Sequence, residues 1–419
     1  MNSGQTNLLS PARNNAAAGW HDVWRGPLEE PCPLPAHDTA HVILDDARGE
    51  AGGLLFHRPH EIVEAHALEE VHPALERIRD GVKRGYHAAG YLAYEAGFAL
   101  EPRLTGLHRG VSAQPMLWFG LFDAPSAVRW PSPGHPPGAA ARKLIPALSE
   151  AAYRQKVRDI LALIEAGDCY QVNLTHEATL EDYGPPLERY LALRGLQQAG
   201  WGGMLSTGET MLQCFSPELF FMLHDQTLNT RPMKGTAPRG ADAQEDAQIR
   251  ERLRADPKER AENLMIVDLL RNDLSRVARP GSVKVDALFA IETYPTLHQM
   301  TSSISARLQA GYDAVDAIKR LFPCGSVTGA PKIRAMEIIA VQEQRHRGAY
   351  TGSMGYIAPD GSACFNVMIR TLVSAAQGGP ISFGVGSGIV RDSDPAAEWA
   401  ECHAKARFLT ARPCSGTRR

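Results

Sequence analysis

The chain has 419 residues, of which 44% are hydrophobic and 22% charged, and its formal net charge is −3. This composition indicates a globular protein with a large core and excludes a disordered chain. No basic stripe is present, so nucleic acid is not expected as a partner. No apolar run reaches membrane-spanning length, and the first residues lack a signal pattern. We therefore expect a cytoplasmic protein without membrane contact. The seven scattered cysteines agree with this location, because their odd number favours reduced thiols.

The first third of the chain begins irregularly and then alternates strand and helix patterns. Residues 1–37 are rich in Pro, Asn and Gly, and no regular element is expected there. Residues 38–130 are expected to form the N-terminal part of the fold. Short apolar runs within them predict strands, and one apolar stripe predicts an amphipathic helix. The expected strands are 41–44, 53–56 and 90–95, and the expected helix is 69–84.

A Pro- and Gly-rich stretch at 131–145 indicates a linker or exposed loop. From 146 to 412 strand and helix patterns recur without a repeat of fixed length. Strands and helices interspersed in this way indicate an α/β chain in the broad sense. We expect the main functional domain to lie in 146–412.

Two pairs of glutamates follow Asp-Pro steps at 256 and 394. Aspartate caps a helix well and proline fits its first position, so each step predicts a helix start. The members of each pair are three residues apart and share a helix face. The pairs are Glu259 with Glu262 and Glu398 with Glu401. Glutamates on a solvated helix face are the ordinary alternative. Two pairs in the same setting favour a Mg²⁺ site, since hard oxygen ligands without histidine suit this ion.

Lys234 and Glu218 are the candidate catalytic residues. Lys234 lies between Met233 and Gly235, which predicts a strand end or tight loop. A lysine there is usually exposed and inert; a nucleophilic role requires desolvation, which lowers its pKa and leaves a free amine. Glu218 precedes an apolar run, where burial would raise its pKa and suit a proton carrier. A buried glutamate paired with an arginine is the alternative.

Two glycine-rich stretches and one arginine complete the candidates. The backbone of 384–388 can approach a carboxylate closely, but its spacing is not that of a dinucleotide site. The stretch 325–332 lacks the ending of a phosphate loop, and a plain turn before a helix at 331–341 explains it. Arg370 lies in a strand-like apolar run, where it needs a carboxylate from the protein or from a ligand.

In this order, the motifs resemble the chorismate-utilising enzymes, and among them the large subunits of aminodeoxychorismate synthases. The similarity is dense over about 150–410 and weaker over 38–125. It rests on six ordered segments: Tyr170–Thr175, Ser216–Phe220, Pro232–Thr236, Glu262–Leu274, Gly329–Lys332 and Glu398–Glu401.

The resemblance implies an α+β type of α/β fold. Two antiparallel sheets would pack face to face with helices outside, and 146–412 would be the chorismate-binding catalytic domain. It also implies Mg²⁺ as cofactor. Glu262 and Glu401 would bind the metal directly, and Glu259 and Glu398 would lie nearby or act through water.

The same resemblance implies two sites for the carboxylates of chorismate. The metal would hold the ring carboxylate, helped by Lys405 and Thr236. Arg370, Tyr350 and the backbone at Gly386 would hold the enolpyruvyl carboxylate.

Within the family, two positions sort the reactions. In aminodeoxychorismate synthases the lysine matching Lys234 attacks ring carbon 2 while the 4-hydroxyl leaves, protonated by the glutamate matching Glu218. Ammonia then enters at carbon 4 and displaces the lysine. In anthranilate synthases that lysine is typically alanine. In isochorismate and salicylate synthases a lysine replaces the residue matching Gln171 and activates water. A family histidine near the ring matches Gln299, or His298 if the alignment slips by one.

Lys234 and Gln171 therefore favour an amination formally classed with the transaminases, supplying 4-aminobenzoate for folate synthesis. The alternatives are anthranilate synthase component I and a catalytically silent subunit that docks a glutaminase. The missing Leu-Leu-Glu-Ser signature of tryptophan-inhibited anthranilate synthases weakly supports the amination. No glutaminase motif is found, so ammonia is expected from a separate glutamine amidotransferase subunit or from solution.

Overall fold

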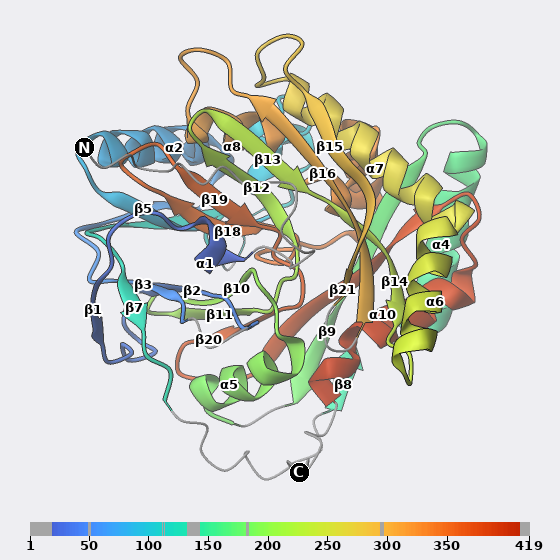
Figure 1. Cartoon of the computed structure of the whole chain (residues 1–419), viewed down its shortest axis with the longest axis horizontal. Helices are drawn as coiled ribbons and strands as arrows, with labels where there is room; N and C mark the ends of the chain where they lie inside the picture. Colours follow the sequence, from blue (N-terminus) through green and yellow to red (C-terminus); the bar gives the residue numbers. More distant parts are fainter. Residues whose placement is uncertain are drawn as a thin grey trace.

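The computed structural model describes residues 19–48, 52–110, 112, 114–131, 143–181, 184–293 and 297–410. Two large sheets, antiparallel apart from the β1–β7 pair, pack against each other, and most of the helices lie on their outer sides (Figure 1). The fold class expected from the sequence is confirmed.

The first sheet has the order β1-β7-β3-β2-β10-β11-β20-β21-β9-β17, with β8 also paired to β9. Its strands are β1 (Glu29–Cys32), β2 (His41–Asp45), β3 (Leu54–His57), β7 (Ser126–Val128), β8 (Lys143–Pro146), β9 (Gln171–Glu181), β10 (Gly202–Ser206), β11 (Thr210–Cys214), β17 (Gly329–Ala330), β20 (Thr371–Ala375) and β21 (Ile381–Val390). The longest pairing joins β21 to β9 in register from Ile381 opposite Leu180 to Val390 opposite Gln171.

The second sheet has the order β14-β16-β13-β12-β19-β18-β5-β6-β4, with β15 also paired to β16. Its strands are β4 (Glu61–Ala65), β5 (His87–Leu92), β6 (Leu117–Phe122), β12 (Leu219–His224), β13 (Thr227–Arg231), β14 (Met233–Pro238), β15 (Lys284–Thr293), β16 (Leu297–Arg307), β18 (Ser353–Ile357) and β19 (Ala363–Asn366). Strands from the start of the chain thus pair with strands from its end in both sheets, because β2 lies beside β10 and β5 beside β18.

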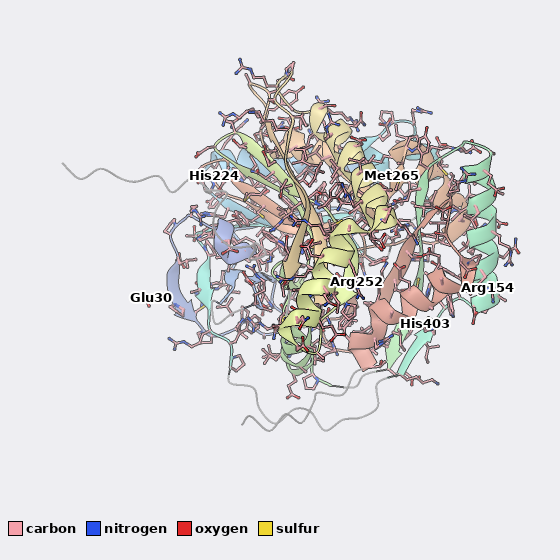
Figure 2. All side chains as sticks on the ribbon, turned by 45° about the vertical axis from the view of Figure 1, so that its right-hand side comes forward. Glu30, Arg154, His224, Arg252, Met265 and His403 are labelled. Atoms are coloured by element: carbon pink, nitrogen blue, oxygen red, sulfur yellow. The ribbon has the colours of Figure 1, made fainter. Side chains whose placement is uncertain are left out.

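Helices cover the outer faces of both sheets. Residues of α2, α7 and α8 share one apolar core with the second sheet, and residues of α4, α5, α9 and α10 share another with the first. A third core lies between the sheets. Exposed side chains such as Arg252 on α6 and His403 on α10 point away from these cores (Figure 2). The α-helices are α1 (Trp20–Val23), α2 (Leu68–Lys83), α3 (Ala96–Leu100), α4 (Glu150–Glu165), α5 (Pro186–Gln197), α6 (Ala243–Ala255), α7 (Pro257–Ser275), α8 (Ala314–Leu321), α9 (Lys332–Glu343) and α10 (Pro395–Thr410), and the 3₁₀ turns are η1 (Thr105–Leu107) and η2 (Gly325–Val327).

Local signals placed several elements correctly. The Asp256 carboxylate accepts hydrogen bonds from the first backbone N–H groups of α7, and Asp394 does the same for α10. Strands β2 and β3 and helix α2 match the expected ranges within one residue at most ends. The strand expected at 90–95 instead runs from His87 to Leu92, because β6 and β18 flank it over those residues.

Two expectations of irregular structure differ from the fold. Within 1–37, the described residues contain α1 and β1. Trp20 is fully buried between the sheets, where its indole N–H donates to the Gly202 carbonyl at 2.7 Å and its ring lies 6.4 Å from that of Tyr356. Within 131–145, residues 132–142 lie outside the described residues, and 143–145 belong to β8. The domain boundaries stay predictions.

No helix in the described ranges is long and apolar enough to cross a membrane.

Candidate active site

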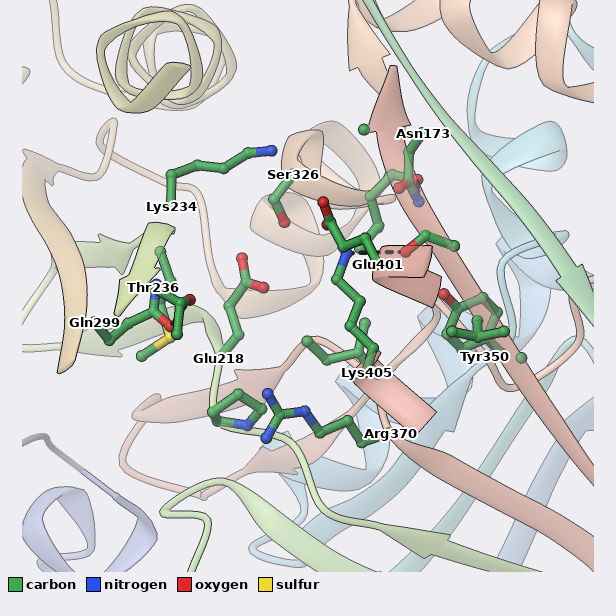
Figure 3. Close-up of a pocket in the computed structure, with 18 of the residues that line it drawn as sticks. Asn173, Glu218, Lys234, Thr236, Gln299, Ser326, Tyr350, Arg370, Glu401 and Lys405 are labelled. Atoms are coloured by element: carbon green, nitrogen blue, oxygen red, sulfur yellow. Dashed lines mark hydrogen bonds and ion pairs between the residues drawn. The ribbon is translucent and has the colours of Figure 1, made fainter. Parts of the chain in front are cut away.

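A cavity of about 230 Å³ is lined by both sheets (Figure 3). The second sheet supplies β14 and the segment just before β12, and the first sheet supplies β21 and part of β9. Helix α10, the turn at η2, Gln299 of β16 and the links that carry Tyr350 and Arg370 also line the cavity. Most of the candidate residues from the sequence lie here: Glu218, Lys234, Thr236, Tyr350, Arg370, Gly386, Glu401 and Lys405.

Lys234 lies on β14, where the pairing with β16 is irregular between Met233 and Thr236. It is the second residue of β14, so it lies at the beginning of a strand, as the sequence predicted. Its side chain is 21% exposed and its Nζ lies 3.5 Å from a carboxylate oxygen of Glu262 on α7. Glycine at position 388 leaves room for this amine, because a Cβ there would lie 3.2 Å from Lys234 Nζ. The amine is thus largely enclosed and directed into the cavity.

Glu218 is 6% exposed and directs its carboxylate into the cavity on the side of Lys234 (Figure 3). Burial raises the pKa of Glu218 to about 7, although the Ser326 hydroxyl and the Lys234 and Lys405 ammonium groups act in the opposite direction. One carboxylate oxygen is buried without a hydrogen-bond partner. The backbone is fixed, since Glu218 N donates to Ser216 Oγ at 3.1 Å. A carboxyl in this state can carry a proton near neutral pH.

The glutamates of α7 lie beside the lysine strand. Burial and the neighbouring charges of Glu262 and Asp256 raise the pKa of Glu259. Its carboxylate lies against the backbone of Gly235, where an added Cβ would come within 2.8 Å of Glu259 Oε2. Gly235 has a φ of 81°, so this close approach and the backbone conformation both favour glycine.

The glutamates of α10 have different surroundings. Glu401 forms a 2.7 Å ion pair with Lys405, whose Nζ also donates to the Gly386 carbonyl at 2.9 Å. Burial alone would raise the pKa of Glu401, but the Lys405 charge outweighs it and the pKa lies below its usual value. Glu398 accepts a 2.6 Å hydrogen bond from Ser393, and its other oxygen is buried without a partner.

The four glutamates of α7 and α10 are the residues predicted to hold Mg²⁺. Within the described ranges, no three His, Cys, Asp or Glu side chains come close enough together to hold a metal ion. The Lys234 charge nevertheless acts on both Glu259 and Glu401, and Lys234 Nζ is paired with Glu262. Carboxylates from two helices therefore lie within electrostatic range of one amine. Their all-oxygen chemistry fits Mg²⁺, which takes few protein ligands and keeps water.

Gln171 and Thr236 lie near Lys234. Gln171 is fully buried, both polar atoms of its side chain lack a hydrogen-bond partner, and its Nε2 would lie 3.3 Å from a Cβ at position 388. Thr236 Oγ1 donates to Gln299 Oε1 at 3.0 Å, and Gln299 Nε2 donates to the Gly235 carbonyl at 2.8 Å. Gln299 lines the cavity. The fully buried His298 ring is instead bonded to Thr293 and Asp246.

Arg370 and Tyr350 line another side of the cavity. Arg370 was expected within a strand, but it lies in the link between β19 and β20 with a φ of 52°. Its Nη1 donates to Gln197 Oε1 at 2.6 Å. The Tyr350 ring packs on the backbone of Gly384, where an added Cβ would come within 2.2 Å. Burial raises the pKa of Tyr350 above its usual value.

Two polar residues of the lining, Ser326 and Asn173, were not predicted from the sequence. Ser326, in the stretch interpreted as a plain turn, lines the cavity, and its hydroxyl lowers the pKa of Glu218. Asn173 donates from Nδ2 to the Val327 carbonyl at 3.1 Å and so ties β9 to that turn. A polar residue between the apolar Val172 and Leu174 was the only local signal for Asn173.

The fold and the cavity define an enzyme-type site for a small anionic ligand, with an enclosed amine, a proton-carrying acid and cationic walls. The chain belongs to the chorismate binding enzymes, a family whose pattern matches residues 36–411. Aminodeoxychorismate synthase component 1 of Klebsiella aerogenes is 42% identical over 287 residues, which cover 68% of this chain and 63% of that protein. Anthranilate synthase component 1 of Streptomyces coelicolor is 42% identical over 263 residues, covering 62% of this chain and 51% of that protein.

The chain thus matches less than two thirds of the length of these curated relatives. Among solved structures, anthranilate synthase component I from Streptococcus pneumoniae superposes with a TM-score of 0.75 at 23% identity, covering 92% of this chain and 94% of that one. At this identity the likeness establishes the fold alone.

Proposed function

We propose that the protein converts chorismate and ammonia to 4-amino-4-deoxychorismate. The main support for this proposal is that the Lys234 amine and the Glu218 carboxyl, whose pKa is about 7, line one cavity. A primary amine beside an acid that can donate a proton suits addition to an electron-poor ring with loss of a hydroxyl. The aminodeoxychorismate synthases among the relatives support this choice of reaction.

The proposed chemistry proceeds in two balanced substitutions. The lone pair of Lys234 Nζ forms a bond to ring carbon 2, the ring double bond shifts, and the carbon 4–oxygen bond breaks. Glu218 gives its proton to the departing hydroxyl, which leaves as water. Ammonia then forms a bond to carbon 4, the double bond shifts back, and the bond between carbon 2 and Lys234 breaks. The ammonium formed when Lys234 adds to the ring gives a proton to the Glu218 carboxylate, and Glu218 returns it to the lysine nitrogen as that nitrogen leaves. The proton released by the added ammonia then restores the Glu218 acid, so the amine is regenerated and one ammonia replaces one water overall.

In this proposal Glu262 and Glu401 hold Mg²⁺, with Glu259 and Glu398 nearby. When bound, the ion supplies positive charge that holds the ring carboxylate of chorismate. Lys405 and Thr236 flank the same carboxylate.

The other carboxylate of chorismate is assigned to the opposite side of the cavity. Arg370 can form charge-assisted hydrogen bonds with it, while the Tyr350 hydroxyl and the backbone at Gly386 complete its surroundings. Gln171 is neutral and cannot take a proton from water, which disfavours a hydroxylating reaction. Ammonia would come from a separate glutamine amidotransferase subunit in the cytoplasm, and the product would serve 4-aminobenzoate and folate synthesis.

Anthranilate synthesis is the second candidate, because an anthranilate synthase component is also 42% identical, over 263 residues. The assay that separates the two contains purified protein, chorismate, Mg²⁺ and ammonium, with products resolved by mass and fluorescence. We expect aminodeoxychorismate. Fluorescent anthranilate would refute the proposal, and no turnover at all would leave a glutaminase-docking subunit as the better account.

A further inference from the structure

Arg347 lies behind the cavity without lining it. Its side chain is 1% exposed, and Nε and Nη2 donate to the two carboxylate oxygens of Glu343 at 2.9 and 2.6 Å. Nη1 donates to the Val327 carbonyl at 2.8 Å and to Thr351 Oγ1 at 3.3 Å, and Nη2 donates to the Asn173 carbonyl at 2.7 Å. A guanidinium has five N–H groups, so all of them have an acceptor here.

These acceptors belong to separate parts of the cavity wall. Asn173 lies on β9 and Val327 in η2, and both line the cavity. Thr351 follows Tyr350, another lining residue. Val327 also follows Ser326, another lining residue, whose hydroxyl lowers the pKa of Glu218. One buried side chain therefore connects three segments that form one wall. Asn173, Ser326 and Tyr350, which belong to these segments, are labelled in Figure 3.

The guanidinium is itself held in a fixed place. Glu343 also accepts hydrogen bonds from Thr175, through its backbone N–H at 2.8 Å and its hydroxyl at 3.0 Å. Thr175 pairs with Gly386 of β21, which lines the cavity. The Arg347 backbone N–H donates to the buried Glu95 at 2.6 Å, and its guanidinium lies 4.5 Å from the centre of the Tyr94 ring.

We propose that Arg347, held by Glu343, is a positioning residue that fixes β9, the η2 turn and the Tyr350–Thr351 turn relative to one another. Through Val327 it aligns the Ser326 hydroxyl with the Glu218 carboxylate. This inference rests on the proposed function, because its readout is turnover. Lysine cannot replace the arginine, since its three donors leave one atom and cannot reach acceptors on opposite sides.

The consequence for Glu218 separates positioning from simple stability. The Ser326 hydroxyl lowers the pKa of Glu218 against the effect of burial. If Arg347 is lost and the η2 turn moves the hydroxyl away, this effect weakens and the pKa of Glu218 rises. The acid then stays protonated to higher pH, so the alkaline limb of the pH–rate profile should move to higher pH. A residue that only stabilises the fold would leave this limb in place.

The test compares kcat, KM and the pH profile of Arg347→Lys with those of the wild type. Arg79→Lys is the matched control. Like Arg347, Arg79 donates hydrogen bonds through all three of its nitrogens, here to the carboxylates of Glu76 and Asp313. It joins α2 to the start of α8, away from the cavity. We expect kcat of Arg347→Lys to fall by about 10- to 100-fold, with KM changing less and the alkaline limb shifted upward. Arg79→Lys should keep the wild-type kcat and limb.

An unchanged limb and kcat in folded Arg347→Lys would overturn the inference, as would equal losses in both variants. If Arg347→Lys does not fold, Glu343→Gln serves instead. It keeps the volume and one acceptor, so a smaller limb shift in the same direction is expected, and none would overturn the inference. If the wild type itself does not aminate chorismate, the proposed function is wrong, and the inference that rests on it fails as well. A wild type that aminates chorismate beside an unchanged Arg347→Lys overturns the inference alone.

Discussion

The buried carboxyl of Glu218 should make the folded protein less stable as the pH rises. Burial raises its pKa from 4.5 to about 7. Such a group binds its proton more tightly in the folded state, so its stabilising contribution is full below pH 4.5 and is lost as the pH rises through 7. At about 1.4 kcal/mol per pH unit, ionised Glu218 destabilises the fold by about 3 kcal/mol at pH 8.

Glu218→Gln removes this ionisation while keeping the shape of the side chain. Relative to the wild type, the variant should gain about 2.5 kcal/mol in free energy of unfolding between pH 5 and pH 8. Its amination activity should fall by about 10²- to 10⁴-fold, because glutamine cannot donate the proton to the leaving hydroxyl. Thermal and urea unfolding at pH 5, 6.5 and 8 measure the first effect, and the chorismate assay measures the second.

Glu343→Gln provides a control, because the pKa of Glu343 is shifted in the direction opposite to that of Glu218. Burial alone would raise the pKa of Glu343, but the adjacent Arg347 outweighs it and the pKa is lowered. Its stabilising contribution is therefore present above its unfolded pKa and is lost only on acidification. This variant should be less stable than the wild type at pH 5 and at pH 8. If Glu218→Gln showed the same pH dependence of stability as the wild type, the carboxyl would not be the poised acid that we infer.

Three further outcomes are expected. Lys234→Ala should lose at least about 10³-fold in amination rate, and Lys234→Arg should not restore it, because guanidinium stays protonated; product formation by mass measures both. Glu262→Gln and Glu401→Gln should each raise the Mg²⁺ concentration for half-maximal activity by at least about 10-fold, and an unchanged Mg²⁺ titration would remove them as ligands. Gln299→Ala should raise KM for chorismate with little loss of melting temperature, whereas His298→Ala should lower the melting temperature; the reverse pattern would exchange their roles.

The sequence predicted those parts of the fold that depend on local chemistry. The Asp-Pro steps at 256 and 394 identified the starts of α7 and α10, because capping and proline geometry act within one turn. The order of the strands had no such signal from the residues alone. The pairing of β2 with β10 and of β5 with β18 joins segments far apart in sequence, and only the family resemblance implied two packed sheets.

The same distinction applies to the site. The raised pKa of Glu218 was predictable, because the apolar residues that follow it signal burial. The left-handed conformation of Arg370 was not, since no glycine or asparagine marks that position. Arg347 gave no signal either, because the fold brings its acceptors together from separate segments, and two of them are backbone carbonyls. The roles assigned to the glutamates, the metal and the partner stay predictions.

The most direct test of the proposed chemistry is the mass of the peptide that contains Lys234 after incubation with chorismate and Mg²⁺ without ammonium. Covalent addition at carbon 2 with loss of water predicts an increase by the mass of chorismate less one water. This increase should be absent in Lys234→Ala and should disappear, with release of aminodeoxychorismate, once ammonium is added. Amination at the full rate in Lys234→Ala, with no adduct in the wild type, would contradict the lysine mechanism.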